Sequence, residues 1–252
     1  MNVKDKVIAI TGASGGLGRH FALTLAAHGA RIAACARRLP LLQELEAQIK
    51  SAGGSACAVE LDVTSKESAE AAYSAIESAL GAPPNVLINN SGLTANAAWL
   101  DQTESDWDQV LDTNLKGAFL MSSAFGRRWK AAARPGAIIN IASILGLRQA
   151  GGVGPYAVSK SGLIQMTKTM AFELAREGIQ VNSVSPGPIA TAFNLETYGR
   201  QPGKMETMAA RVPVGRFGEP REVAEAIVFL ATLEGQFIAG HDLVVDGGYI
   251  IL

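Results

Sequence analysis

Cysteine is scarce in this chain of 252 residues, which contains only Cys35 and Cys57. Neither belongs to a Cys-x-x-Cys pair, and two thiols in separate apolar runs provide neither a disulfide framework nor a set of zinc ligands. The sequence therefore argues against a disulfide-stapled secreted scaffold and a zinc knuckle, and we expect no metal site. A reduced, cytoplasmic setting is expected instead.

Long hydrophobic runs and an excess of charge of one sign are also missing. No stretch reaches the ~18 consecutive apolar residues of a transmembrane helix, and the apolar run after the charged N-terminus is too short for a signal peptide. The 22 Lys and Arg residues nearly balance the 23 Asp and Glu residues, which argues against a basic surface for nucleic acid. We expect neither a membrane nor a nucleic acid as a partner.

Apolar segments of two kinds alternate along the chain. Runs of β-branched and apolar residues are typical of buried strands, and the segments between them carry apolar residues at helical spacing, such as Leu42, Leu45 and Ile49. This alternation predicts an α/β fold, a parallel sheet with helices on both faces, in a single domain over 1–252. The expected strands lie at 7–10, 31–36, 56–61, 86–88, 137–141, 179–184 and 243–245.

Longer helices are predicted over 104–133 and 154–176, after which the periodicity ends between Pro186 and Pro220. Long irregular segments in compact domains often cover a site. We therefore expect a substrate loop at about 188–219 with short helical pieces. Pro220 then begins a last helix, because proline is tolerated at the first helical position.

Glycines gather directly after the first predicted strand, in Thr11-Gly12-Ala13-Ser14-Gly15-Gly16-Leu17-Gly18. Glycine lets the backbone approach a pyrophosphate, and the N-terminus of the following helix supplies unpaired N–H groups and a partial positive charge. The segment indicates a dinucleotide site, although a simple glycine-rich turn remains the alternative. The predicted cofactor-binding residues of this turn are Gly12, Ser14, Gly16, Leu17 and Gly18.

The same segment contains a literal Gly-x-Ser-x-Gly motif around Ser14, the nucleophile elbow of α/β-hydrolases. A serine hydrolase also needs a later histidine, and His241 satisfies that order. However, no HGGG-type oxyanion segment occurs, and the elbow would follow the first strand of the chain. A hydrolase is therefore the weaker interpretation.

The second predicted strand ends in Cys35-Ala36-Arg37-Arg38. Dinucleotide-binding folds that prefer NAD carry an acid near this point for the ribose 2′-hydroxyl, whereas arginine suits a 2′-phosphate. The guanidinium groups of Arg37 and Arg38 therefore favour NADP(H) over NAD(H). The alternative is that both arginines are ordinary solvated residues before a helix.

Tyr156 and Lys160 stand four residues apart near the start of a predicted helix, which places both side chains on one face. A phenol is a poor acid–base group at neutral pH, and a neighbouring ammonium lowers its pKa by stabilising the phenolate. The pair is therefore a candidate for proton transfer. Taken alone, this spacing is common on solvated helix faces.

The context of the pair strengthens that interpretation. In order and spacing, the chain resembles the short-chain dehydrogenase/reductase family, except that Ser91 replaces the usual alanine. The resemblance implies a Rossmann-type, doubly wound sheet of seven strands and hydride transfer between a nicotinamide and a carbonyl/alcohol pair. The segments that carry it are 11–18, Asn89-Asn90-Ser91-Gly92, Asn114, Ser143, Tyr156-Ala157-Val158-Ser159-Lys160, Pro186-Gly187 and Asp246-Gly247-Gly248.

The resemblance also assigns roles to four residues. It makes Tyr156 the acid that protonates the incipient alkoxide during reduction, and Ser143 the hydrogen-bond donor to the reacting carbonyl oxygen, where charge develops. Lys160 would lower the Tyr156 pKa and hold the nicotinamide ribose. Asn114 would hold a water that links Lys160 to solvent.

For the rest of the cofactor, the resemblance places Asp62 and Val63 beside the adenine and Asn90 beside a ribose. Asp62 could instead be a helix cap after the third strand. The segment 186–191 would surround the nicotinamide. Its predicted binding residues are Pro186, Gly187, Ile189 and Thr191, of which Thr191 could also be an ordinary loop residue.

The expected substrate walls are apolar, which predicts a ketone or its alcohol with hydrophobic bulk. Two alternatives stay open: a 3-oxoacyl-carrier-protein reductase, and an NADP(H)-binding regulator without catalysis. The predicted pocket residues are Leu93, Ser143, Leu145, Val153, Tyr156, Phe193 and Met205.

A homotetramer or dimer is implied by the resemblance, through the two long central helices and the last strand. The apolar tail at 249–252 agrees, because four such residues would otherwise be exposed.

Overall fold

One parallel sheet forms the centre of the molecule, with the strand order β3-β2-β1-β4-β5-β6-β7. The computed structural model describes residues 3–192, 194–195, 203–232 and 237–251. Each predicted strand is present and each adjacent pair is parallel, so the α/β class is confirmed. The strands are β1 (Val7–Thr11), β2 (Arg31–Ala36), β3 (Ser55–Glu60), β4 (Val86–Asn89), β5 (Gly136–Ile141), β6 (Ile179–Pro186) and β7 (Asp242–Val245).

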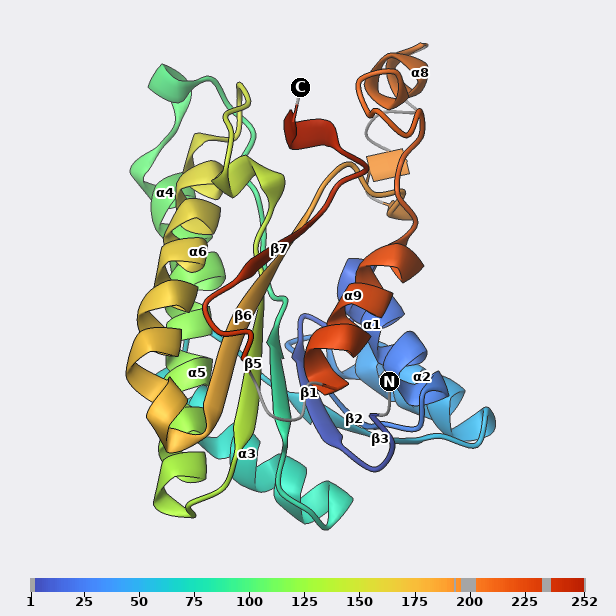
Figure 1. The fold of residues 1–252 in the computed structure, drawn as a ribbon, viewed down its shortest axis with the longest axis vertical. Helices are drawn as coiled ribbons and strands as arrows, with labels where there is room; N and C mark the ends of the chain where they lie inside the picture. The colour runs from blue at the N-terminus through green and yellow to red at the C-terminus, as the bar shows by residue number, and fades with distance from the viewer. Residues whose placement is uncertain (1–2, 193, 196–202, 233–236, 252) are drawn as a thin grey trace.

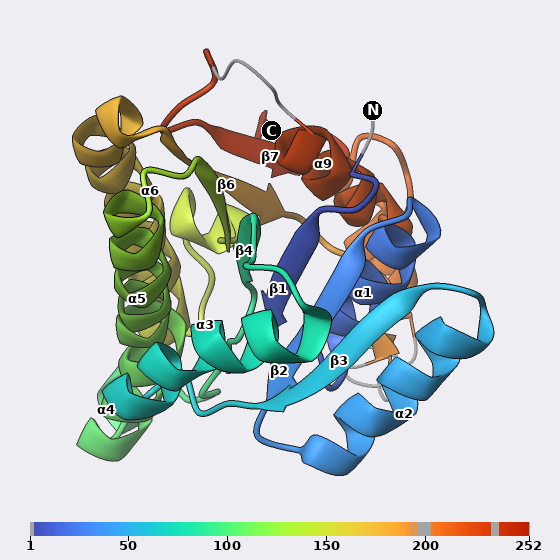
Figure 2. The same ribbon diagram turned by 90° about the horizontal axis from the view of Figure 1, so that it is seen from below.

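Helices cover both faces of the sheet (Figures 1 and 2). One face packs against α1 (Gly16–Ala27), α2 (Leu39–Ser51) and α9 (Pro220–Thr232), and the other against α3 (Lys66–Leu80), α5 (Gly117–Ala131) and α6 (Gly154–Leu174). The apolar stripe of α2 is fully inward, since Leu42, Leu45 and Ile49 are buried. The shorter elements are η1 (Trp99–Asp101), α4 (Glu104–Leu111), η3 (Ile144–Gly146), η4 (Ala175–Glu177), α8 (Lys204–Ala209) and η5 (Tyr249–Ile251).

The long helical region predicted over 104–133 is confirmed, and it consists of three consecutive helical segments. A capping box between Thr103 and Asp106 begins α4, and a π-helical turn, η2 (Asp112–Lys116), then separates α4 from α5. Such turns displace side chains from the regular helical register. Here the turn carries Asn114, which is buried.

The strand order reverses between β1 and β4, where the chain has crossed from one half of the sheet to the other. In open α/β sheets, ligands bind at the carboxyl ends of the strands beside such a reversal. Between β6 and α9, the described residues include α8, helical positions at 192 and 194–195, and a bridge between Ile189 and Gly218. Within the described residues, no helix is both long and apolar enough to span a bilayer.

Candidate active site

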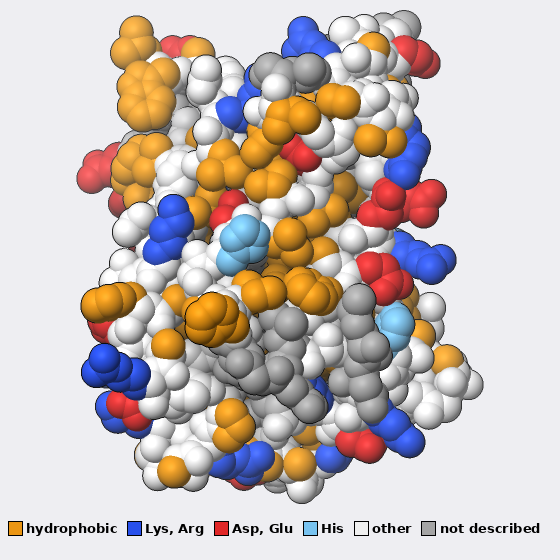
Figure 3. All heavy atoms as spheres, viewed as in Figure 1, with side chains coloured by type: hydrophobic (Ala, Val, Ile, Leu, Met, Phe, Trp, Pro, Cys, Tyr) orange, Lys and Arg blue, Asp and Glu red, His pale blue; other side chains and the backbone are white. Residues whose placement is uncertain are grey.

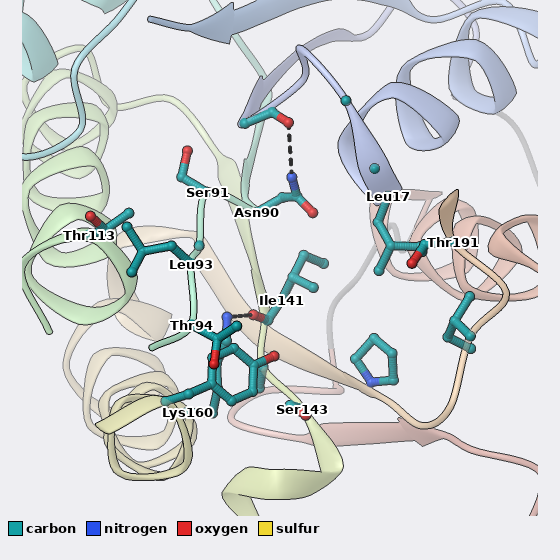
Figure 4. A pocket seen from close by; sticks show the side chains of 18 of the residues that line it. Leu17, Asn90, Ser91, Leu93, Thr94, Thr113, Ile141, Ser143, Lys160 and Thr191 are labelled. Atoms are coloured by element: carbon teal, nitrogen blue, oxygen red, sulfur yellow. Dashed lines mark hydrogen bonds between the residues drawn. The ribbon is translucent and has the colours of Figure 1, made fainter. Parts of the chain in front are cut away.

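A cavity of about 940 Å³ opens at the carboxyl ends of the strands and brings together most of the predicted site residues. Figure 4 shows side chains from both halves of the sheet pointing into it. The predicted cofactor residues in its wall are Gly12, Ser14, Gly16, Leu17, Arg37, Arg38, Asp62, Val63, Asn90, Tyr156, Lys160, Pro186, Gly187, Ile189 and Thr191.

The glycine-rich turn after β1 is tied to the end of β4. Asn90 Nδ2 donates to the carbonyl of Thr11 (2.9 Å), and the Thr11 hydroxyl accepts from the N–H groups of Asn90 and Ser91 (3.0 Å each). Gly18 lies beneath the turn, outside the cavity wall, where an added Cβ would be 2.5 Å from the Gly12 carbonyl oxygen. Gly18 therefore lets the start of α1 approach the turn closely, which favours a pyrophosphate site at this helix N-terminus.

We expect Gly18→Ala to weaken NADPH binding at least about tenfold and to lower Tm, because the new methyl group pushes the turn out of place and overpacking costs about 1–3 kcal/mol. Fluorescence titration with NADPH and thermal unfolding measure the two effects. Gly126→Ala in α5 is the control, since an added Cβ there meets nothing within 4 Å. Equal NADPH binding by the Gly18 variant and the wild type would contradict the assignment.

Two exposed guanidinium groups border the cavity after β2. Arg38 Nη2 donates to the Ser14 hydroxyl (3.0 Å), which links the end of β2 to the glycine-rich turn. Asp62, after β3, does not cap a helix, because its carboxylate accepts from the N–H (3.0 Å) and hydroxyl (2.8 Å) of Thr64. These hydrogen bonds lower the pKa of Asp62, and the charge of Arg37 lowers it further. The cavity wall near the end of β2 therefore carries two guanidinium groups, with the carboxylate of Asp62 close to that of Arg37.

The strand topology excludes the serine-hydrolase interpretation. Ser14 follows the carboxyl end of β1, whereas His241 precedes the amino end of β7. Because the strands are parallel, these two residues lie at opposite edges of the sheet and cannot form a nucleophile–base pair. The Gly-x-Ser-x-Gly motif is part of the turn that starts α1.

Tyr156 and Ser143 lie together at the centre of the cavity wall. Ser143 follows β5 and caps η3, where its hydroxyl accepts from the Leu145 N–H (3.1 Å). Burial raises the pKa of Tyr156, and the hydrogen bond with Ser143 lowers it in part. The phenol is thus protonated at neutral pH and able to donate a proton to a group in the cavity.

Lys160 is buried one turn after Tyr156, with its ammonium 5.5 Å from the centroid of the Tyr156 ring. Its Nζ donates to the Ile141 carbonyl (2.7 Å; Figure 4). Burial lowers the pKa of Lys160 to about 8. The lysine is charged at neutral pH, and its predicted effect on the Tyr156 pKa stays a prediction.

Asn114 lies behind the cavity wall and fixes the segment that follows β4. Its Oδ1 accepts from the Leu93 N–H (2.8 Å), and its Nδ2 donates to the Leu93 carbonyl (2.9 Å) and the Ser159 hydroxyl (3.0 Å). The buried amide therefore connects η2, the 90–94 segment and α6. Its predicted water link to Lys160 stays a prediction.

The reduction rate should fall as the pH rises through about 8. Lys160 loses its proton there, and a neutral amine no longer stabilises the phenolate that forms when Tyr156 donates its proton. A kcat/KM profile between pH 6 and 10 measures this. Lys160→Met should be slow at every pH and lack the step near pH 8. A wild-type profile that stays flat to pH 9.5 would show that this ammonium is not needed.

The apolar wall contains Leu93, Leu145 and Val153, as expected. Met205 of α8 is not in the wall, because the helix turns Met208 toward the cavity instead. Phe193 lies outside the described residues.

Several wall residues were not predicted as site residues, and seven of them have polar side chains, namely Thr64, Ser91, Thr113 and four others. The four others belong to the segments after β4 and β6 and to the C-terminal turn, whose spacing in the sequence carries no periodic signal. They are Thr94, Asn96, Asn194 and Tyr249.

Comparison with known proteins supports the same assignment. Residues 12–250 match a family model described as Enoyl-(Acyl carrier protein) reductase. A 3-oxoacyl-[acyl-carrier-protein] reductase of Vibrio cholerae is 36% identical over the whole of both chains. Human (3R)-3-hydroxyacyl-CoA dehydrogenase is 34% identical, covering 98% of this chain and 96% of that protein. The chain belongs to the short-chain dehydrogenase/reductase family.

Solved structures of this family have the same fold. A short-chain type dehydrogenase/reductase from Mycobacterium marinum superposes with a TM-score of 0.90 at 34% identity, over 98% of this chain and 96% of that one. A provisionally named 2-deoxy-D-gluconate 3-dehydrogenase from Agrobacterium tumefaciens, with bound NADP, has a TM-score of 0.91 at 34% identity, over 100% and 98%. The chain is therefore an oxidoreductase that acts on hydroxyl and keto groups with a nicotinamide cofactor.

Proposed function

We propose that this short-chain dehydrogenase/reductase is an NADP(H)-dependent reductase of ketones that carry a hydrophobic chain, with 3-oxoacyl thioesters as the substrate class. The observation that carries the proposal is one cavity bordered by Arg37 and Arg38, by Ser143, Tyr156 and Lys160, and by apolar side chains. The same cavity thus offers positive charge for the 2′-phosphate of NADPH, and a proton donor and an apolar wall for the ketone.

The chain's own residues would assist the reaction as follows. Bound NADPH supplies the hydride. Ser143 donates a hydrogen bond to the carbonyl oxygen, where negative charge grows, and Tyr156 transfers its proton to that oxygen. Lys160 then holds positive charge beside the phenolate, and Asn114 keeps the Leu93 backbone in place. Both donors stabilise the transition state more than the ketone, because the charge is largest there.

The substrate class rests on two observations. The cavity wall contains Leu93, Leu145 and Val153, which suit an alkyl chain. The similar proteins from Vibrio cholerae and human are named for 3-oxoacyl and 3-hydroxyacyl thioesters. A 3-oxoacyl thioester and a 3-hydroxyacyl thioester are the ketone and the alcohol of one pair, and their interconversion fits the chemistry of Ser143 and Tyr156.

The test is NADPH consumption with acetoacetyl-CoA, with 3-oxoacyl N-acetylcysteamine thioesters and with simple ketones of matched size. We expect the thioesters to react fastest, with the corresponding 3-hydroxyacyl products. Preferred turnover of a simple ketone would reject the thioester class. NADPH binding without turnover of any compound would instead identify a cofactor-binding regulator.

We also propose that two or four copies associate through the helical face of α5 and α6 and through β7. Phe119, Val158 and Phe172 on these helices are exposed, the last by 89%. Figure 3 shows further hydrophobic side chains gathered over β7 and between α6 and α9. Exposed apolar area of this kind marks an interface more often than free surface.

Multi-angle light scattering tests the assembly. We expect a tetramer or dimer, and a smaller species after Phe172→Glu, because a carboxylate cannot be buried unpaired in such an interface. Glu173→Gln is the control on the same helix. A stable wild-type monomer would remove this proposal.

A cytoplasmic location is consistent with the free, buried thiols of Cys35 and Cys57.

A further inference from the structure

The C-terminal turn contributes a wall residue to the cavity. After β7, the carboxylate of Asp246 accepts from the N–H groups of Gly248 and Ile250 (2.8 Å each), which fixes the turn that leads into η5. Tyr249, the first residue of η5, is half-buried and lines the cavity. Figure 1 shows this end of the chain at the top of the molecule, between the α6 side and the α8 side.

Arg148 joins Tyr249 to the loop between η3 and α6. Its guanidinium carbon lies 4.7 Å from the centroid of the Tyr249 ring, and its Nη1 donates to the Tyr249 carbonyl (3.2 Å). Arg148 belongs to the loop between η3 and α6, which contributes Ala150 and Val153 to the cavity wall, next to Leu145 of η3. The contact between Arg148 and Tyr249 therefore holds two parts of the wall together, the η3–α6 loop and the C-terminal turn.

A third contact holds the turn from the other direction. The carbonyl of Gly247 accepts from the Val214 N–H (3.3 Å). Gly247 and Gly248 have positive φ angles, and an added Cβ would be 2.8 Å from Val212 and 3.1 Å from Pro213, respectively. The turn that carries Tyr249 is thus packed between the η3–α6 loop and the segment after α8.

These contacts bear on how far a substrate can extend. The segment after Ser143, η3 and the η3–α6 loop, lines the same cavity as Ser143 and Tyr156, so a chain attached to a carbonyl at these two residues can extend along it. The rigid ring of Tyr249 is tied to the same loop. We propose that Tyr249 sets the upper limit of substrate chain length and that Arg148 is the positioning residue that holds its ring. This inference rests on the proposed reduction of 3-oxo compounds.

The test compares 3-oxoacyl N-acetylcysteamine thioesters of four and ten carbons. For Tyr249→Ala, we expect the ratio of kcat/KM for the long to the short substrate to rise at least about tenfold, chiefly through a lower KM for the long one. Tyr249→Leu should give a smaller rise in the same direction and serves if the alanine variant does not fold.

Arg148 is tested in parallel. Arg148→Gln should raise the same ratio by a few-fold, because the ring is no longer held, and Arg148→Lys should remain nearer to the wild type, because an ammonium also attracts the ring face. Arg176→Gln, an exposed arginine in η4 at the far end of α6, is the control and should leave the ratio unchanged.

The outcomes separate this inference from the function on which it rests. Active Tyr249 variants with an unchanged ratio would overturn the chain-length limit and leave the reductase intact. A rise for Tyr249→Ala with none for Arg148→Gln would keep the limit and remove the positioning role. A wild type that reduces neither thioester would overturn both proposals.

Discussion

Tyr156→Phe should lower kcat for ketone reduction by about 10³-fold while NADPH binding stays within about twofold of the wild type. The substitution removes only the phenolic oxygen, so the ring still packs beside Lys160 while the proton that would neutralise the growing alkoxide is gone. Pre-steady-state reduction and NADPH fluorescence titration measure the two quantities separately.

Tyr73→Phe is the matched control for this change. Tyr73 is buried in α3 among Phe125 and its neighbours, away from the cavity, and loses the same oxygen. Its kcat should remain near that of the wild type. If Tyr156→Phe also turned over ketones at nearly the wild-type rate, another group would have to supply the proton and the proposed mechanism would be wrong.

Replacing both Arg37 and Arg38 with glutamine should lower kcat/KM for NADPH by about 100-fold and change the value for NADH only a few-fold. A charge-assisted hydrogen bond contributes about 1.5–3 kcal/mol, and each 1.4 kcal/mol corresponds to a factor of ten. The two cofactors differ only in the 2′-phosphate, so the loss is specific to the ligand that carries this charge. Initial rates with each cofactor at fixed substrate measure it.

The control removes an equal amount of charge elsewhere. Arg127 and Arg128 are also adjacent and exposed, on α5, where they contact Glu70 and Ser74. Their double glutamine variant should keep the wild-type preference for NADPH. A wild-type enzyme that works better with NADH would refute the assignment of Arg37 and Arg38 before any variant is made.

The sequence predicted the strands well because buried parallel strands are short, apolar and bounded by turns. β2 begins at Arg31 and ends at Ala36, as expected. The break at η2 could not be predicted, because the reason for it is distant: Asn114 bonds to the backbone of Leu93, 21 residues earlier. A local apolar pattern contains no information on such a contact.

In the candidate site, too, features that are local in the sequence could be predicted, and features that depend on distant contacts could not. The glycine-rich turn and the Tyr156–Lys160 pair are compact in sequence and could be predicted. Tyr249 could not, because it reaches the cavity only through the pairing of β7 with β6 and the contact with Arg148. Met208, and not Met205, lies in the wall; which of the two faces the cavity depends on the packing around the short α8, which the sequence pattern does not contain.

The bond between Asn90 and the turn after β1 also has a consequence for the order of folding. β1, β2 and β3 are consecutive along the chain and need only short loop closures, whereas Asn90 must return to Thr11 across 79 residues. The first half of the nucleotide site can thus form early without being able to hold a ligand. Binding energy from the cofactor then stabilises only the finished chain, by about 2.7 kcal/mol at a ligand concentration of 100 Kd. Bound cofactor should therefore slow proteolysis of the complete fold, because it stabilises only a chain in which Asn90 has reached Thr11.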